Sequence, residues 1–355
     1  MPIVRVAALV LGLLSAVLAH ATVQRTFVAS TGSDANTAFN CSIVKPCRGF
    51  AAAIGVTSAK GEVVVLDSAA YGVIPSITQS VTITAPTGIY AGISVFSGDG
   101  IIINAGINDT VVLRGLTING QGGANGITIT NALVVHVENC VIANMTGIGI
   151  NQIKGLLEVK DTIIRNNGNI GVYVVGPAQA NLDHVRLEAN NTGLAAEFGG
   201  FVAMQDSVVT GSNNIGVVIS NTPTTNSQGT ISHSLISSNN YGIFLSAAES
   251  QTTTAMVSIS ESAISNNNVG VHGTGNNGAC TCSYANLKHN IVAGNGTGVE
   301  VVDRGVVNMD GNYIQSTNIG LDLFVDSKSF VQTSGTNLVA GINASPASIN
   351  SLPLF

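Results

Sequence analysis

The sequence predicts an all-β fold, a parallel β-helix of about ten coils, from three observations. A unit of roughly 24 residues repeats through about two thirds of the chain. Each unit contains short stretches of Val, Ile and Thr, which favour strands, separated by Asn and Gly, which favour turns. Beyond residue 60 no segment shows sustained helical periodicity. We therefore expect each coil to add one strand to each of two or three parallel sheets.

Two columns of the repeat define how the coils stack. An apolar residue opens each unit, and a glycine follows it about 11 residues later. Because strands in a sheet lie about 4.8 Å apart, about ten coils predict a rod about 50 Å long. The apolar column is Val137, Val159, Leu182, Met204, Ile231, Ile259, Leu287 and Met309, and the glycine column is Gly147, Gly171, Gly193, Gly216, Gly242, Gly270, Gly298 and Gly320.

A third column consists of asparagines, which we expect to stack their side-chain amides on one another at a turn. Such a ladder would satisfy polar groups that otherwise cost free energy when buried. We interpret these asparagines as structural. They are Asn166, Asn190, Asn213, Asn239, Asn266 and Asn295.

The N-terminal residues predict export. Residues 1–21 contain an apolar run followed by an Ala-x-Ala cleavage pattern at Ala19 and Ala21, which is typical of a signal peptide. The apolar run is shorter than the roughly 20 residues needed to span a bilayer. We therefore expect a secreted or periplasmic protein with no transmembrane segment in the mature chain.

The two ends of the mature chain depart from the repeat. Residues 22–76 are expected to form an N-terminal cap, in which a short helix containing Phe50, Ala53 and Ile54 plugs the first coil. The β-helix is expected to span residues 77–325. Residues 326–355 lose the repeat and are expected to form an irregular C-terminal cover or tail.

The turns resemble those of a known group of proteins. The Asn-Asn-x-Gly-Ile/Val turns that begin at Asn213 and Asn239, and the N-terminal stretch from Val28 to Phe50, resemble bacterial secreted right-handed parallel β-helix proteins of the pectate-lyase-like superfamily. The resemblance covers residues 26 to about 345. It implies a single-stranded, right-handed solenoid. It does not imply an activity, because one fold carries many functions.

Composition limits the partners of the protein. The formal net charge is −6 and only 9% of the residues are charged, so no basic stripe is present to bind nucleic acid. The abundance of β-branched residues argues against disorder. A polysaccharide or a cell-envelope glycan is the partner that we expect, and the oligomeric state stays open.

The cysteines predict one disulfide. Cys41 and Cys47 flank a short loop in the cap and are expected to pair in an oxidising compartment. Cys140 falls in a column of small residues and is expected to be buried. Cys280 and Cys282 leave two alternatives open, a strained bridge or two free thiols. A metal site there would need further ligands, so no metal is expected.

A first candidate site is a group of three insertions. The connection between the glycine column and the next apolar column lengthens in three consecutive coils, at residues 221–229, 246–255 and 273–283. Because coils stack in register, these inserts are expected to project side by side from one edge. They are rich in Thr, Ser and Asn, which suits hydrogen bonding to sugar hydroxyls. The alternative is neutral variation of surface loops.

A second candidate is the column two residues after each opening apolar residue, in which acids and imidazoles alternate. At a separation of about 5 Å, neighbouring opposite charges stabilise each other. The column could bind a cation or perform acid–base chemistry, or it could be a corner ladder that avoids stacking like charges. Its members are Asn139, Asp161, His184, Asp206, His233, Glu261, His289 and Gly311.

A third candidate is the concentration of charge between residues 154 and 188. Uronate lyases of the superfamily hold calcium with acidic residues and remove a proton with Arg or Lys. The Arg-x-Pro-x-x-Arg pattern of pectate lyases and the Asn-Thr-Asp and Gly-His-Gly patterns of polygalacturonases are not found. Surface ion pairs are the alternative interpretation. The catalytic candidates are therefore weak: Lys160, Asp161, Arg165, Asp183, Arg186 and Asp206.

The leading functional hypothesis is non-catalytic binding of carbohydrate or of the cell-envelope surface, through a polar face and the adjacent loops 221–229, 246–255 and 273–283. This hypothesis requires no cofactor. One alternative is a polysaccharide lyase, hydrolase or epimerase that acts on acidic glycans, and calcium would be expected in the lyase case. Another alternative is a structural or adhesive rod.

Overall fold

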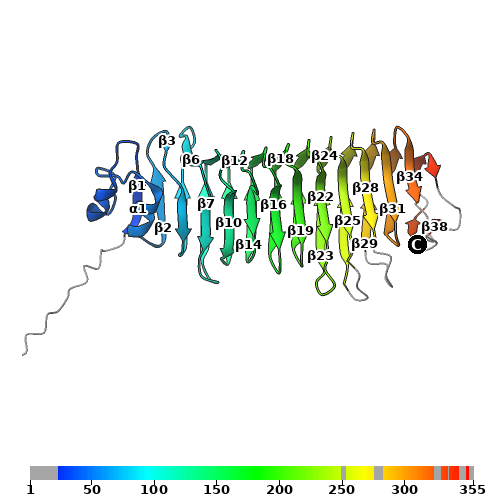
Figure 1. Cartoon of the computed structure of the whole chain (residues 1–355), viewed down its shortest axis with the longest axis horizontal. Helices are drawn as coiled ribbons and strands as arrows, with labels where there is room; N and C mark the ends of the chain where they lie inside the picture. Colours follow the sequence, from blue (N-terminus) through cyan, green and yellow to red (C-terminus); the bar gives the residue numbers. More distant parts are fainter. Residues whose placement is uncertain are drawn as a thin grey trace, which may run out of the picture.

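The computed structural model describes residues 23–248, 253–275, 283–323, 329–334, 336–343 and 349–351. Over these residues the chain forms three parallel sheets of 14, 12 and 12 strands, wound into one right-handed rod of about 11 turns (Figure 1). The helices of the described part are a 3-10 helix, η1 (Asp34–Phe39), and one α-helix, α1 (Phe50–Val56). The predicted all-β, right-handed parallel β-helix is confirmed.

Each coil contributes a strand to sheet A, then to sheet B, then to sheet C. Sheet A contains β1 (Val23–Val28), β2 (Thr57–Val65), β5 (Val81–Thr84), β8 (Thr110–Arg114), β11 (Val134–Glu138), β14 (Leu156–Lys160), β17 (Gln179–Asp183), β20 (Phe201–Gln205), β23 (Ser227–Ser232), β26 (Ala255–Ser260), β29 (Ser283–Lys288), β32 (Val306–Asp310), β35 (Phe330–Thr333) and β38 (Ile349–Ser351).

Sheet B has the shortest strands, because most coils turn again after three residues. It contains β3 (Ala69–Ala70), β6 (Ala91–Val95), β9 (Leu116–Gly120), β12 (Val141–Ala143), β15 (Ile163–Arg165), β18 (Arg186–Glu188), β21 (Val208–Thr210), β24 (Leu235–Ser237), β27 (Ala263–Ser265), β30 (Ile291–Ala293), β33 (Tyr313–Gln315) and β36 (Leu338–Ala340).

Sheet C closes each coil. It contains β4 (Ile74–Ile77), β7 (Asp99–Asn104), β10 (Asn125–Asn131), β13 (Ile150–Gln152), β16 (Ile170–Val175), β19 (Thr192–Glu197), β22 (Ile215–Ser220), β25 (Tyr241–Ser246), β28 (Val269–Thr274), β31 (Thr297–Val302), β34 (Ile319–Leu323) and β37 (Ile342–Asn343).

The opening apolar column forms one ladder inside the rod. Val159 pairs with Leu182, Leu182 with Met204, and Met204 with Ile231, each on the next strand of sheet A. These side chains are buried, at 2% exposure or less. Alternate residues of each strand therefore fill a continuous core, and the residues between them face outward.

The glycine column lies at the start of the strands of sheet C, where backbones of adjacent coils approach closely. A Cβ atom on Gly216 would lie 2.5 Å from the carbonyl oxygen of Gly242, and one on Gly193 would lie 2.6 Å from that of Gly216. No other residue fits without a shift of the backbone. In the first aligned coil Gly149 occupies this column, since a Cβ there would meet the carbonyl of Gly171, and the expected Gly147 lies two residues earlier.

The asparagine ladder is present at the turn between sheets B and C, but half of its predicted members were wrong. Asn190, Asn239 and Asn295 are buried in it. The other positions belong to Asn167, Ser212 and Asn267, whereas Asn166, Asn213 and Asn266 are exposed. Asn239 Nδ2 donates to Asn267 Oδ1 at 3.0 Å, and Asn267 Nδ2 donates to Asn295 Oδ1 at 2.9 Å.

The reason for the error is a left-handed residue directly before the ladder position. Asn166 and Asn266 have φ values of 53° and 56°. Asparagine is favoured both in this conformation and in a stacked amide ladder, so residue type did not distinguish the two members of an Asn-Asn pair. In the coil of Asn213 the ladder position is taken by Ser212, whose amide donates to Asn239 Oδ1 at 2.8 Å.

A second ladder of small polar residues lines the turn between sheets A and B. The amide of Cys140 donates to Thr162 Oγ1 at 3.2 Å, and that of Ser207 donates to Ser234 Oγ at 3.2 Å. Cys140 is buried at 1% exposure, as expected for a small core residue. Burial raises the pKa of its thiol to about 11.

The N-terminal cap closes the exposed edge of the rod. In α1, Phe50 and Ala53 are fully buried, and Ile54 is buried beside them against the first coil. Cys41 and Cys47 form the expected disulfide, and its loop covers the free edge of β1. The amide of Phe27 donates to Cys41 O at 2.8 Å. This loop satisfies backbone groups that an open edge strand would leave available to another chain.

The stacked coils extend beyond the expected limits of 77–325. Strands β2, β3 and β4 already form a coil, and β35 to β38 continue the three sheets at the other end. The C-terminal residues keep a ladder even though they lose the sequence repeat, because the Asn312 amide donates to Asn337 Oδ1 at 2.9 Å. The expected leader, residues 1–21, and Cys280 and Cys282 lie outside the described residues.

In the described part of the chain, no helix has the length and apolar character needed to cross a membrane.

Candidate functional site

The outer face of sheet A carries charged, amide and hydroxyl side chains near the middle of the rod. One row of outward side chains runs across consecutive strands at the centre of the sheet. It changes from charged to uncharged polar residues along the rod, which places different hydrogen-bonding groups about 4.8 Å apart. The row consists of His136, Glu158, Asn181, Ala203, Thr230, Ser258, Asn286 and Asn308.

A depression of about 350 Å³ interrupts this row. It forms because the methyl group of Ala203 in β20 is much shorter than its neighbours, Asn181 in β17 and Thr230 in β23. Glu158 of β14 borders the depression, and Asn181 Nδ2 donates to Glu158 Oε1 at 2.9 Å. Asp183, Gln205 and Ser232 complete the polar lining.

A second outward row lies on the side of the depression where the strands of sheet A begin, and from β14 to β26 it alternates apolar residues with glutamines. Leu156, Phe201, Met256 and Tyr284 are its half-buried apolar members on β14, β20, β26 and β29. Gln179 lies between Leu156 and Phe201, and Gln228 lies between Phe201 and Met256. Aromatic and aliphatic surfaces of this kind can pack against the C–H faces of sugar rings. Around the depression, the face of sheet A therefore offers single apolar side chains, separated by glutamines, beside a polar floor.

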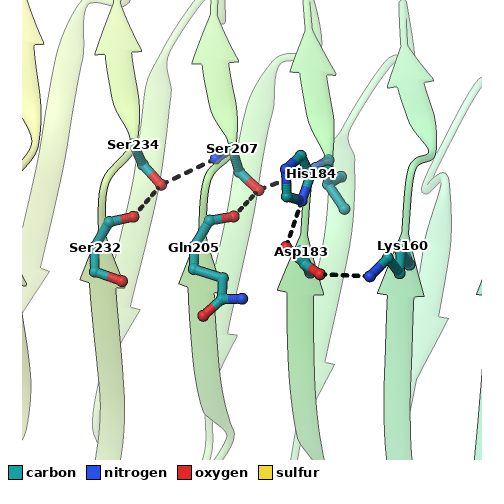
Figure 2. A network of polar contacts seen from close by, with 8 residues as sticks. Lys160, Asp183, His184, Gln205, Ser207, Ser232 and Ser234 are labelled. Carbon is teal, nitrogen blue, oxygen red and sulfur yellow. Dashed lines mark hydrogen bonds and ion pairs between the residues drawn. The ribbon is translucent and has the colours of Figure 1, made fainter.

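A polar network lies at the opposite border, where the strands of sheet A end (Figure 2). Lys160 Nζ is 3.0 Å from Asp183 Oδ2, and Asp183 Oδ1 is 2.6 Å from His184 Nδ1. The Lys160 ammonium is the largest cause that lowers the pKa of Asp183, and Asp183 in turn raises the pKa of Lys160. Both groups therefore carry their charges at neutral pH.

Next to this network, the alternating acid and imidazole column is a corner of the backbone. Asp161, His184, Asp206, His233 and Glu261 all have positive φ values between 48° and 54°. Short polar residues and histidine tolerate this left-handed conformation better than β-branched residues, which gives the column a structural cause. Within it, His233 Nε2 lies 2.7 Å from Glu261 Oε2.

Three residues of this region offer atoms that could hold a metal ion. Asp183, His184 and Asp206 have potential ligand atoms within 4.8 Å of one another. Calcium takes six to eight oxygen ligands, whereas this group offers two carboxylates and an imidazole. Lys160 already neutralises Asp183. The donor set therefore fits calcium poorly.

The structure divides the six catalytic candidates between two sheets. Lys160 and Asp183 end strands of sheet A, and Asp161 and Asp206 directly follow β14 and β20. Arg165 and Arg186 instead belong to β15 and β18 of sheet B, where Arg186 Nε donates to Glu188 Oε1 at 2.6 Å.

Sequence reasoning missed Asn181 and Ala203, which form the floor of the depression together with Glu158, a residue of the charged segment 154–188. Their signal was present in the column of residues that precede each opening apolar residue. In that column a single alanine stands between longer polar side chains. This column indicates a short side chain at Ala203, whereas the strand pairing shows that the position faces outward between Asn181 and Thr230.

The three inserts leave the rod at the same corner. They connect β22 to β23, β25 to β26 and β28 to β29, all from sheet C to sheet A, and Figure 1 shows the loop between β22 and β23 at this edge of the rod. Asn221 Nδ2 donates to Thr253 Oγ1 at 3.1 Å, so the first two inserts are in contact. Residues 249–252 and 276–282 lie outside the described residues.

The inserts lead directly into strands of the sheet A face. Their described ends run into β23, β26 and β29, the strands that carry Gln228, Met256 and Tyr284. These connections therefore enter the sheet that carries the depression.

Comparisons with known proteins agree with this architecture. A family model described as "right handed beta helix region" matches residues 99–283. No curated protein matches the sequence. Among solved structures, the Dettilon tailspike protein is similar with a TM-score of 0.64 at 11% identity, covering 92% of this chain and 68% of the tailspike chain.

Two further similar structures are enzymes by their titles. The catalytic domain of a GH87 α-1,3-glucanase in complex with nigerose has a TM-score of 0.56 at 12% identity, covering 88% of this chain and 68% of the glucanase chain. The A-module of a mannuronan C-5 epimerase from Azotobacter vinelandii has a TM-score of 0.51 at 14% identity, covering 91% and 97%. At these identities the likeness establishes the fold alone.

Proposed function

The chain belongs to the right-handed β-helix family, and from this premise we propose that it binds a polysaccharide or a cell-envelope glycan along the outer face of sheet A. The depression at Ala203, with its lining of carboxylate, amide and hydroxyl groups, is the observation that carries the proposal. The fold neighbours whose titles name a glucanase with bound nigerose and a mannuronan epimerase support a carbohydrate-related role.

The chemistry of the face matches that of a sugar ring. A pyranose presents hydroxyl groups around its edge and C–H groups on its faces. Glu158 supplies acceptors, Asn181 supplies both donors and acceptors, and Thr230 supplies a hydroxyl. Phe201, beside Ala203 on β20, supplies an aromatic surface for the C–H groups.

The length of the face suits a polymer better than a single sugar. Outward polar residues continue from Thr230 through Ser258 and Asn286 to Asn308 on successive strands. The inserts 221–229, 246–255 and 273–283 lead into β23, β26 and β29, which carry this continuation, and their sequences are rich in Thr, Ser and Asn. We propose that the glycan lies across the strands, with one sugar in the depression.

The disulfide supports a secreted or periplasmic location for this activity. Cys41 and Cys47 are paired and fully buried in the cap, which is expected where the compartment is oxidising. Such a location would place the protein next to cell-envelope and extracellular glycans.

A glycan array and calorimetry with the filled-in variant Ala203→Gln test the proposal. The longer side chain would occupy the depression, and we expect binding to weaken at least about tenfold, a loss of 1.4 kcal/mol or more. The matched control is Ala263→Gln, an outward alanine on β27 of sheet B. Equal binding by both variants and the unaltered protein would place the glycan elsewhere.

A second variant tests the contribution of the loops. Shortening all three inserts to the length of the connections in the other coils is expected to weaken binding of long glycans more than that of short ones. Binding that does not change after this shortening would remove the loops from the proposed site.

Catalysis on the bound glycan is a second candidate function, favoured by the group formed by Lys160, Asp183, His184 and Asp206 beside the depression. Such groups can donate or accept protons. Incubation with pectate, alginate and glycosaminoglycans, followed by assays for unsaturated products and reducing ends, tests the lyase and hydrolase versions. An epimerase requires analysis of the product stereochemistry. Activity lost in Asp183→Asn would establish this function, and a purely structural rod would show no saturable glycan binding at all.

A further inference from the structure

We propose that the depression at Ala203 selects neutral glycans and disfavours polyuronates. The inference rests on the proposed function, since it names the substrate class of the same site. The charges of the four strands that line the depression carry it.

Carboxylates outnumber cations on these strands. β14, β17, β20 and β23 together contain two carboxylates, Glu158 and Asp183, and one cation, Lys160. Lys160 Nζ is 3.0 Å from Asp183 Oδ2, so its charge is already compensated. Glu158 accepts a hydrogen bond from the neutral amide of Asn181, and its neighbour in register on β11 is the imidazole of His136. Among the described residues, no Lys or Arg forms an ion pair with Glu158.

The corner next to the depression adds negative charge. Asp161 and Asp206 directly follow β14 and β20, and both are exposed. His184, which lies between them in the corner column, is bonded through Nδ1 to Asp183. A polyanion that entered the depression would therefore meet the carboxylates of Glu158 and Asp183 in its lining, with the exposed Asp206 carboxylate within 4.8 Å of Asp183 at the adjoining corner.

Recognition of a uronate would require the opposite arrangement. Sites that bind carboxylates normally supply Arg or Lys, often in a bidentate pair. Lys160 belongs to the outward row formed by the last residues of the sheet A strands. The next Arg and Lys in that row are Arg114 of β8 and Lys288 of β29. Arg114 Nη2 is 2.7 Å from Glu138 Oε2, and Lys288 pairs in register with Asp310, so a carboxylate already lies beside each of them.

A neutral sugar finds a complementary lining in the same place. Hydroxyl groups donate to carboxylates in charge-assisted hydrogen bonds, which are shorter and stronger than bonds between neutral groups. Glu158 and Asp183 can accept such bonds, while Asn181 and Gln205 can donate to ring and hydroxyl oxygens. The excess of acceptors suits a ligand rich in hydroxyl donors and free of charge.

The experiment compares hexamers of equal length by calorimetry on the full chain. The neutral probes are oligomers of glucose, xylose, mannose, galactose and N-acetylglucosamine, and the anionic probes are oligomers of galacturonate and mannuronate. At low ionic strength we expect at least one neutral hexamer to bind at least about tenfold more tightly than either uronate. High salt is expected to narrow the difference, because it screens the repulsion.

Two variants that each remove one negative charge test whether the selection against uronates arises at the depression. Glu158→Gln keeps the shape and an acceptor for Asn181, and it is expected to strengthen uronate binding several-fold at low salt. Glu188→Gln removes the same charge from β18 of sheet B, where Glu188 is bonded to Arg186, and is expected to change neither class of binding.

The outcomes distinguish failure of the selectivity for neutral glycans from failure of the proposed glycan-binding function. Uronate binding as tight as that of every neutral hexamer, or an equal effect of the two variants, overturns the selection for neutral glycans and leaves the binding face intact. Binding of no hexamer overturns the proposed function, and the selection with it.

Discussion

Asparagine has two distinct tasks in each turn between sheets B and C. It can adopt the left-handed conformation, as Asn166 does at a φ of 53°, or it can stack its amide in the buried ladder, as Asn167 does one residue later. Both tasks suit the same side chain. An asparagine in the sequence therefore predicts the turn. Which of two adjacent asparagines joins the ladder depends on which one lies beside the ladder amide of the neighbouring coil.

The ladder position can be tested with a pair of alanine substitutions. Asn239→Ala would remove the acceptor of the Ser212 amide and the donor to Asn267 Oδ1, at buried positions. We expect a loss of about 2–4 kcal/mol in the free energy of unfolding, because buried partners lose their hydrogen bonds. Urea unfolding followed by circular dichroism measures this change.

Asn213→Ala is the matched control, since Asn213 is exposed in the equivalent turn of the preceding coil. Its expected effect is within about 0.5 kcal/mol. A loss at Asn213 as large as that at Asn239 would mean that the observed register of the ladder is incorrect.

At the scale of elements, the cap protects the one free strand edge at the N-terminal end of sheet A. β1 pairs with β2 on one side, and the disulfide loop covers its other side through the amides of Phe27 and Ala29. The helix α1 fills the open end of the core with Phe50. The cap helix was predictable from the spacing of its apolar residues, whereas the contact between the loop and β1 was not, because it joins segments that share no pattern.

Removal of the disulfide is expected to loosen the cap alone. Replacement of both Cys41 and Cys47 by serine should cost about 2 kcal/mol by the loop-entropy relation for so short a loop. Hydrogen exchange should accelerate at the amides of Phe27 and Ala29, which donate to Cys41 O and Cys47 O. Amides of β20 serve as the internal control, because each coil contacts only its neighbours. Faster exchange in β20 to the same degree would show that the rod unfolds as one unit.

At the scale of the whole molecule, carboxylates with lowered pKa values lie along the rod from the first coil to the last ones. The ordinary pKa of 3.8 is lowered at Asp67 by a hydrogen bond from Ser30, at Asp109 by one from Ser80, at Asp183 by Lys160 and at Asp310 by Ser334. A carboxyl group with a lowered pKa in the folded state favours folding when it is ionised.

The stability of the rod should therefore depend on pH in one direction. The contribution of these carboxylates is fully present above their unfolded pKa of about 3.9 and is lost as the pH falls through their lower folded values. We expect the thermal midpoint to vary little between about pH 5 and 8 and to fall below about pH 4. Calorimetry across this range measures it.

The variant Asp67→Asn is the control for this pH dependence, because Asp67 bonds to both Ser30 and Tyr71. It should lower the midpoint at neutral pH and show a shallower decline in acid. A rod that becomes more stable below pH 4 would contradict the ionised state of these groups.

The sequence by itself determined the coil, because the signals for strand and turn are local and recur with a fixed period. It placed the apolar column, the glycine column apart from its first member, the cap helix and the common edge of the inserts 221–229 and 246–255, all of which follow from counting residues. The ends of the rod at β2 and β38 were not predictable this way, since those coils keep the backbone pairing without the repeated residues.

Only the tertiary structure decided which outward side chains share a surface. Glu158, Asn181 and Ala203 are separated by more than 20 residues at each step and become neighbours through lateral pairing of β14, β17 and β20. The depression is an absence of side-chain volume at Ala203, and it exists only because longer side chains flank that position on both sides. A shift of one residue in register would turn these side chains into the core, since alternate residues of a strand face opposite ways.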